Sequence, residues 1–185
     1  MSDSMYATKA NVSGSVKDWM AVLGVTIGAF LAIIDIQITN ASLADIEGAI
    51  SATPEEGSWI STGYLMAEIV VIPLSGWLPF VLGFRRYLLG STALFLVCSI
   101  ACAFSTTLFE MVVFRAGQGL TGGILIPTAF TTIALRLPAR QHATGFAIFG
   151  LTANLAPAIG PALGGWLTEN LSWQYVFYVN LMDRI

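Results

Sequence analysis

Three ionisable residues, Asp35, Glu68 and Arg115, lie inside long apolar stretches of this sequence. A charged side chain in such a stretch is costly unless it faces the interior of a helix bundle and finds a partner there. The two carboxyl groups could carry protons or bind cations, and the guanidinium could clamp a carboxylate or modulate its protonation. Each of the three is therefore a candidate functional residue.

Further polar residues follow Asp35 at helical spacing. Thr39 and Ser42 come at i+4 and i+7, and Gln37 and Asn40 form a second, adjacent stripe. A helix face this polar is not expected to contact lipid, because it must bond a neighbouring helix or line a cavity. An interhelical hydrogen-bond network and a transport pathway remain equally supported, and the two are compatible.

Arg115 shares its predicted helix face with Gln118, Gly119 and Gly122, at i+3, i+4 and i+7. The glycines allow another helix to approach closely, and the guanidinium requires an acceptor. A structural clamp and a residue that controls the protonation of a carboxylate are both compatible with this pattern.

Glu68 lies in the middle of an apolar run, with Tyr64 at i−4 on the same face. A carboxyl group removed from water can exchange a proton near neutral pH, as proton-coupled transport requires. The alternative is a carboxylate permanently paired with a neighbouring helix. The functional interpretation is favoured.

The fifth long apolar segment of the sequence is rich in glycine and proline. Pro157 and Pro161 are four residues apart, and Ala156, Gly160 and Gly164 form a stripe of small residues. Each proline removes a backbone donor and bends a helix, and the stripe permits tight packing. The pattern predicts a kinked helix that serves as a packing element or as a pivot.

The remaining reactive side chains predict no metal, cofactor or catalytic site. Cys98 and Cys102 are four residues apart in one apolar run, where buried thiols are expected rather than a disulfide. The single histidine, His142, falls in a polar segment that we expect to be a solvated loop. We expect no enzyme activity, no cofactor and no nucleic-acid partner.

The elements that position these residues are predicted to be transmembrane helices. The chain has 185 residues, 56% of them hydrophobic and only 10% charged, whereas a soluble domain carries about 25% charged residues. Five apolar segments are long enough to cross a bilayer as helices. They lie near residues 19–43, 58–82, 87–104, 108–135 and 143–167, and a stub follows at 175–185. The fold class is therefore an all-α membrane protein, with residues 18–185 as an incomplete bundle.

The basic residues orient the predicted bundle. Six of them fall before the first span or in the second and fourth connections: Lys9, Lys17, Arg85, Arg86, Arg136 and Arg140. The first, third and fifth connections contain no lysine or arginine. Such a bias places these segments in the cytoplasm. Residues 1–17 lack the apolar core of a signal peptide and are predicted to be a disordered cytoplasmic tail.

Four motifs on these helices resemble those of one transporter family. Residues 35–41 are similar to its first-span signature, although Gln37 stands where threonine is usual. Residues 76–86 resemble its cytoplasmic loop motif, although an acid is replaced by phenylalanine. Residues 115–119 and 156–165 resemble its fourth- and fifth-span motifs. Residues 18–180 thus resemble the start of a major facilitator superfamily transporter, specifically the fourteen-span EmrB/QacA-like drug:proton antiporters.

The resemblance implies proton-driven export of small, amphiphilic compounds across a bacterial inner membrane. With this resemblance, the polar and glycine- or proline-rich residues fall into two candidate sets. The proton and substrate pathway would comprise Asp35, Glu68, Arg115, Gln37, Thr39, Asn40, Tyr64 and Gln118. Gating and helix packing would depend on Gly76, Gly83, Arg85, Arg86, Gly119, Pro157, Gly160, Pro161, Gly164 and Gly165. Pumps of this kind are often joined by a membrane-fusion subunit and an outer-membrane channel.

Two other expectations come from the short chain. Transporters of this type place their site between two halves, and five spans with a stub complete neither half. The chain is therefore also compatible with a truncated, non-transporting remnant, or with a fragment that needs another chain to supply the missing helices.

Overall fold

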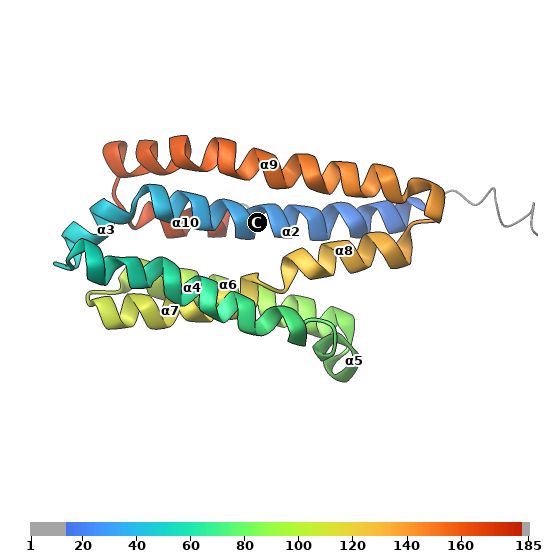
Figure 1. The fold of residues 1–185 in the computed structure, drawn as a ribbon, viewed down its shortest axis with the longest axis horizontal. Helices are drawn as coiled ribbons and strands as arrows, with labels where there is room; N and C mark the ends of the chain where they lie inside the picture. The colour runs from blue at the N-terminus through green and yellow to red at the C-terminus, as the bar shows by residue number, and fades with distance from the viewer. Residues whose placement is uncertain (1–13, 183–185) are drawn as a thin grey trace, which may run out of the picture.

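The computed structural model describes residues 14–182, although not the side chain of Met182. All regular elements in this range are helices (Figure 1). They are α2 (Val16–Ala41), α3 (Leu43–Ala49), α4 (Pro54–Leu74), α5 (Leu78–Leu82), α6 (Phe84–Phe104), α7 (Leu108–Gly122), α8 (Leu125–Arg136), α9 (Ala139–Asn170) and α10 (Tyr175–Met182). Most of the predicted tail, with Lys9, and the last three residues of the predicted stub lie outside the described residues.

Five helical segments are long and apolar enough to cross a membrane: α2, α4, α6, α7 together with α8, and α9. Large apolar side chains point outward from them, such as Ile69 at 68% and Leu151 at 65% exposure. Such side chains suit contact with lipid rather than water. The predicted all-α membrane fold is confirmed.

Sequence signals at the helix starts explain several boundaries. Three long helices begin with capping boxes, in which a hydroxyl and an acid three residues later satisfy free backbone donors. The pairs are Ser15 with Asp18, Thr53 with Glu56, and Thr107 with Glu110. Each box therefore fixes where the chain enters its helix.

Two predicted spans are broken in the structure. The segment 58–82 divides into α4 and the short α5, and 108–135 divides into α7 and α8. The second break follows Gly122 and Gly123, which favour helix weakly, and precedes Pro127. Proline has no N–H to donate to the carbonyl of Gly123, and its ring crowds that carbonyl. A hydropathy profile does not predict such breaks in a helix.

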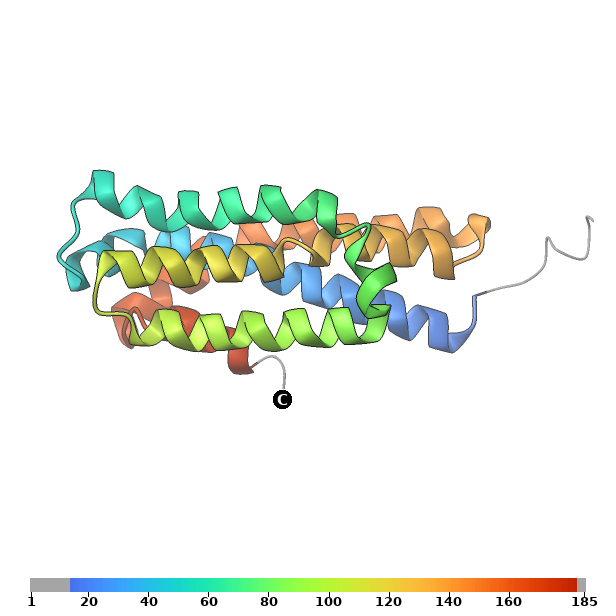
Figure 2. The ribbon, with the colours of Figure 1, turned by 90° about the horizontal axis from the view of Figure 1, so that it is seen from below.

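The helices pack side by side around α2. Figure 1 shows α2 between α9 and the group formed by α4, α6 and α7, and α8 leads from this group back to α2. Helix α10 lies against α6 and α2 (Figure 2). Buried apolar residues form two clusters, and the second includes Ile34, Ile38 and Phe177. These three residues are close neighbours of the buried polar site described below.

The charged residues separate toward opposite ends of the bundle. The start of α2, α5 and the α8–α9 turn lie toward one end, and α3 and the α6–α7 and α9–α10 turns lie at the other (Figures 1 and 2). The first end holds Lys17, Arg85, Arg86, Arg136 and Arg140 together with one acid, Asp18, whose Oδ1 lies 3.7 Å from Nη1 of Arg136. The second end holds Asp45, Glu47, Glu55, Glu56, Glu110 and Glu169. The described basic residues therefore gather at one end, apart from Arg115.

Candidate functional site

A buried ion pair joins α2 to α7. Arg115 Nη1 lies 2.6 Å from Asp35 Oδ2, and the two residues are 0% and 1% exposed. The guanidinium stacks over the ring of Tyr64 on α4, with Cζ 4.5 Å from the ring centroid. Its Nη1 also donates to Gln118 Oε1 at 3.0 Å. Two charges removed from water need such close partners, because their desolvation opposes folding.

The second oxygen of Asp35 belongs to a network that includes α6 and α10. Asn180 Nδ2 donates to Asp35 Oδ1 at 2.5 Å and to Ser99 Oγ at 2.8 Å. Ser99 Oγ also accepts from Gln118 Nε2 at 3.0 Å and donates to the carbonyl of Phe177 at 3.1 Å. The donors and acceptors of Ser99 are thus fully used.

Sequence reasoning missed Ser99 and Asn180. Both are single polar residues in otherwise apolar runs, LFLVCSIACAF and YVFYVNLM. The same signal identified Asp35, but a hydroxyl or amide is less costly in such a run than a charge. The neighbouring thiol of Cys102 is buried and donates to Gln118 Oε1 at 3.4 Å, while Cys98 is half-buried.

Glu68 stands apart from the ion pair. Its side chain is half-buried on α4, and within residues 14–182 it makes neither a hydrogen bond nor an ion pair. A Cβ added at Gly123 would lie 2.7 Å from Glu68 Cγ, so Glu68 packs against the break between α7 and α8. The described residues thus provide no permanent partner for this carboxylate. The hydroxyl of the neighbouring Tyr64 is buried and also lacks a hydrogen-bond partner.

The other polar residues of α2 do not join this network. Gln37 is half-buried, and its Cβ packs against Gly160 of α9. Thr39 is fully buried, and its hydroxyl has no hydrogen-bond partner among residues 14–182. Asn40 is exposed and accepts a hydrogen bond from Ser61 of α4 at 2.5 Å. The structure thus divides the predicted polar face among four neighbouring helices: α7 and α10 at Asp35, α9 at Gln37 and α4 at Asn40.

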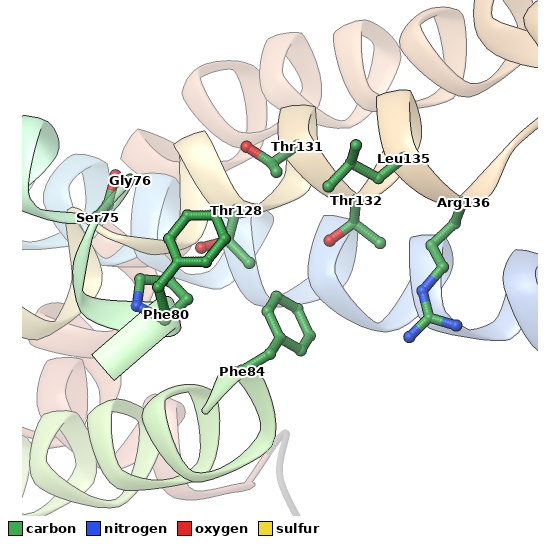
Figure 3. A pocket seen from close by; sticks show the side chains of 10 residues that line it. Ser75, Gly76, Phe80, Phe84, Thr128, Thr131, Thr132, Leu135 and Arg136 are labelled. Atoms are coloured by element: carbon green, nitrogen blue, oxygen red, sulfur yellow. The ribbon is translucent and has the colours of Figure 1, made fainter. Parts of the chain in front are cut away.

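The residues of the predicted cytoplasmic loop motif lie at the surface, apart from the buried ion pair. Arg85 and Arg86 are exposed and form no ion pair within the described range. Gly83 has φ +79°, a conformation that favours glycine. A hollow of about 320 Å³ opens beside Gly76 (Figure 3). Its lining includes Phe80, Phe84, Thr128, Thr131, Thr132, Leu135 and Arg136.

Helix α9 remains continuous through Pro157 and Pro161, which are both exposed. Its buried small residues face α2: a Cβ added at Gly164 would lie 2.8 Å from the carbonyl oxygen of Ile38. A Cβ at Gly165 would meet nothing within 4 Å. Close packing against α2 therefore requires Gly164 but not Gly165.

His142 lies within the first turns of α9, not in a loop as we expected from sequence. The helix starts at Ala139, directly after Pro138, whose fixed φ suits the residue before a helix. The Nε2 atom of His142 is 2.8 Å from the carbonyl oxygen of Leu137.

Comparisons with known proteins agree with the resemblance seen in the motifs. Residues 25–182 match the family description Major Facilitator Superfamily. The chain is 40% identical over 167 residues to the colistin resistance protein EmrB of Acinetobacter baumannii. The aligned region covers 90% of this chain and 33% of the relative. It is 30% identical to the multidrug export protein EmrB of Escherichia coli K12, with 86% and 31% covered.

The multidrug export protein EmrB of Haemophilus influenzae is 31% identical, with 88% of this chain and 32% of the relative covered. The chain thus spans about a third of the length of these relatives. The family match and the five apolar helices indicate a multi-pass membrane protein. By a match that includes most of its residues, the chain belongs to the Major Facilitator Superfamily.

Proposed function

We propose that these residues serve a transporter that exports small, amphiphilic compounds in exchange for protons. The observation that carries the proposal is the buried ion pair between Asp35 and Arg115. Protonation of Asp35 would remove one of two paired charges and leave the guanidinium of Arg115 without its counterion. The energy of a buried pair depends strongly on both charges. The occupancy of one proton can therefore favour one helix arrangement over another.

Glu68 is proposed as a second carboxyl group on the transport path. It lies on α4 next to the α7–α8 break and has no partner among the described residues. A half-buried carboxylate without a counterion can accept a proton or the cationic group of a transported compound. Asp35 would then serve coupling, and Glu68 would be accessible to substrate or solvent.

The proposed location is a bacterial inner membrane with the N-terminus in the cytoplasm. Support comes from the five described basic residues at one end of the bundle. Membrane proteins carry an excess of lysine and arginine on their cytoplasmic side. Relatives are named as multidrug export proteins. A membrane-fusion subunit and an outer-membrane channel are proposed as partners by family resemblance alone.

The substitution Asp35→Asn tests proton coupling. The test uses a chimera in which this chain stands in place of the third of the Acinetobacter relative that it matches. Efflux of amphiphilic dyes such as ethidium is followed in inverted vesicles. We expect Asp35→Asn to lower proton-driven efflux at least about tenfold, because a neutral amide cannot exchange the proton. The exposed Asp45 provides a matched control, and Asp45→Asn should retain full efflux. Undiminished efflux in Asp35→Asn would exclude Asp35 from coupling.

The substitution Glu68→Gln tests the second carboxyl group. We expect efflux to fall about tenfold or more, while the stability of the protein changes by less than about 0.5 kcal/mol, since no partner is lost. The same vesicle measurement, paired with thermal unfolding in detergent, separates the two effects. Glu55→Gln, an exposed acid on the same helix, serves as the control. Equal efflux in both variants would leave Glu68 without a transport role.

A further inference from the structure

Asn180 is the point at which α10 meets the buried ion pair. Its amide group donates hydrogen bonds to Asp35 on α2 and to Ser99 on α6, and the residue is only 2% exposed. Ser99 in turn donates to the carbonyl of Phe177, one turn earlier on α10. Two links therefore tie this eight-residue helix to the carboxylate and its support.

The strength of the first link depends on the charge of Asp35. Arg115 holds Oδ2, and Asn180 donates to Oδ1, so the two donors occupy different oxygens of one carboxylate. A hydrogen bond to an ionised acceptor is about twice as strong as one between neutral groups. Loss of the charge at Asp35 would weaken the bond from Asn180 even if the helices did not otherwise move.

We infer that Asn180, supported by Ser99, is a positioning residue that fixes the carboxylate of Asp35 and makes the docking of α10 depend on the charge of that group. The other ionisable side chains near Asp35 belong to neighbouring helices: Arg115 on α7, Tyr64 on α4 and Cys102 on α6. Asn180 is thus the residue through which α10 bonds Asp35 directly, while the ring of Phe177 on the same helix lies 5.9 Å from Cζ of Arg115. The inference extends the proposed function, but its test does not measure transport.

Hydrogen–deuterium exchange of the 185-residue chain in detergent micelles tests the inference. We expect the amides of α10 to exchange about tenfold faster in Asn180→Leu, which removes the donor at similar volume. Asp35→Asn removes the charge and should have a similar effect on α10. The double variant Asp35→Asn with Asn180→Leu should exchange no faster than Asn180→Leu alone, because that change already removes the bond that the charge of Asp35 strengthens.

A second comparison separates positioning from packing. Exchanging the two residues, as Asp35→Asn with Asn180→Asp, restores a bond between one charged and one neutral partner but loses the donor to Ser99 Oγ. The amides of α10 should therefore exchange more slowly than in Asn180→Leu, without full recovery. Thr39→Val serves as the control, because the buried hydroxyl of Thr39 on α2 has no hydrogen-bond partner in the part of the chain that the structure describes. It should leave α10 unchanged.

Three results would overturn the inference. They are unchanged α10 exchange in Asp35→Asn, additive effects in the double variant, and no rescue by the exchanged pair. Each would mean that the docking of α10 does not depend on the charge of Asp35 through Asn180. Exchange in α4 reports whether a variant has loosened the whole bundle, and Asn180→Leu remains informative if Asp35→Asn does so, since it leaves the ion pair in place.

Discussion

Replacement of Arg115 by methionine is expected to abolish proton-driven efflux and to lower the stability of the bundle by about 3–5 kcal/mol. The reason is the carboxylate of Asp35, which is 1% exposed and would lose the guanidinium 2.6 Å away. Asn180 would remain as its donor, but a neutral amide does not neutralise a buried charge. Efflux in vesicles and unfolding of the chain in detergent measure the two effects.

A double substitution distinguishes the structural from the functional part of this effect. Replacing both charges, as Asp35→Leu with Arg115→Met, should recover most of the stability, because apolar side chains of similar volume often replace a buried ion pair at little cost. Gln118 and Asn180 would still have Ser99 as a partner. Proton-driven efflux should nevertheless stay at least about a hundredfold below the original, since no titratable group remains at the pair.

The exposed Arg85 provides the matched control for Arg115. Arg85→Met should change stability by less than about 0.5 kcal/mol, because within the described part of the chain this guanidinium forms no ion pair. Two results would contradict the assignment of Arg115. One is active efflux in the double variant, and the other is an equal stability loss for both single arginine variants.

The sequence was sufficient to identify Asp35 and Arg115 as interior residues, because a charge within an apolar run must be shielded from lipid. It did not identify them as partners, since they are 80 positions apart and several acids were available. The sequence did not identify Ser99 and Asn180 as site residues, for a different reason. A lone hydroxyl or amide in a span can satisfy itself locally, so only the packing of α6 and α10 reveals their shared role.

The polar stripe on α2 shows a second limit of sequence reasoning. Helical spacing grouped Asp35, Gln37, Thr39 and Asn40 on adjacent faces, but spacing does not specify which neighbour covers each face. In the structure, Gln37 meets α9 and Asn40 meets α4. Hydropathy likewise predicted the apolar segment 108–135 but not the helix break after Gly122. That break depends on backbone hydrogen bonding rather than on hydropathy.

A single methyl group at Gly119 is expected to destabilise the bundle by about 3 kcal/mol. The added Cβ would overlap the backbone carbonyl oxygen of Tyr64 and lie 3.1 Å from Cβ of Ala67. A backbone atom cannot rotate away as the end of a side chain can, so α4 and α7 would have to separate. That movement would also draw the ring of Tyr64 from its position 4.5 Å from Cζ of Arg115.

The comparison of Gly119→Ala with Gly165→Ala gives this prediction its control. Both variants replace a glycine within a helix by alanine, and this replacement by itself stabilises a helix by about 1 kcal/mol. A Cβ at Gly165, however, would meet no described atom within 4 Å. Unfolding in detergent should therefore show a loss for Gly119→Ala and none for Gly165→Ala. Equal stability of the two variants would mean that α4 shifts freely, and Tyr64 would then be no fixed support for the guanidinium of Arg115.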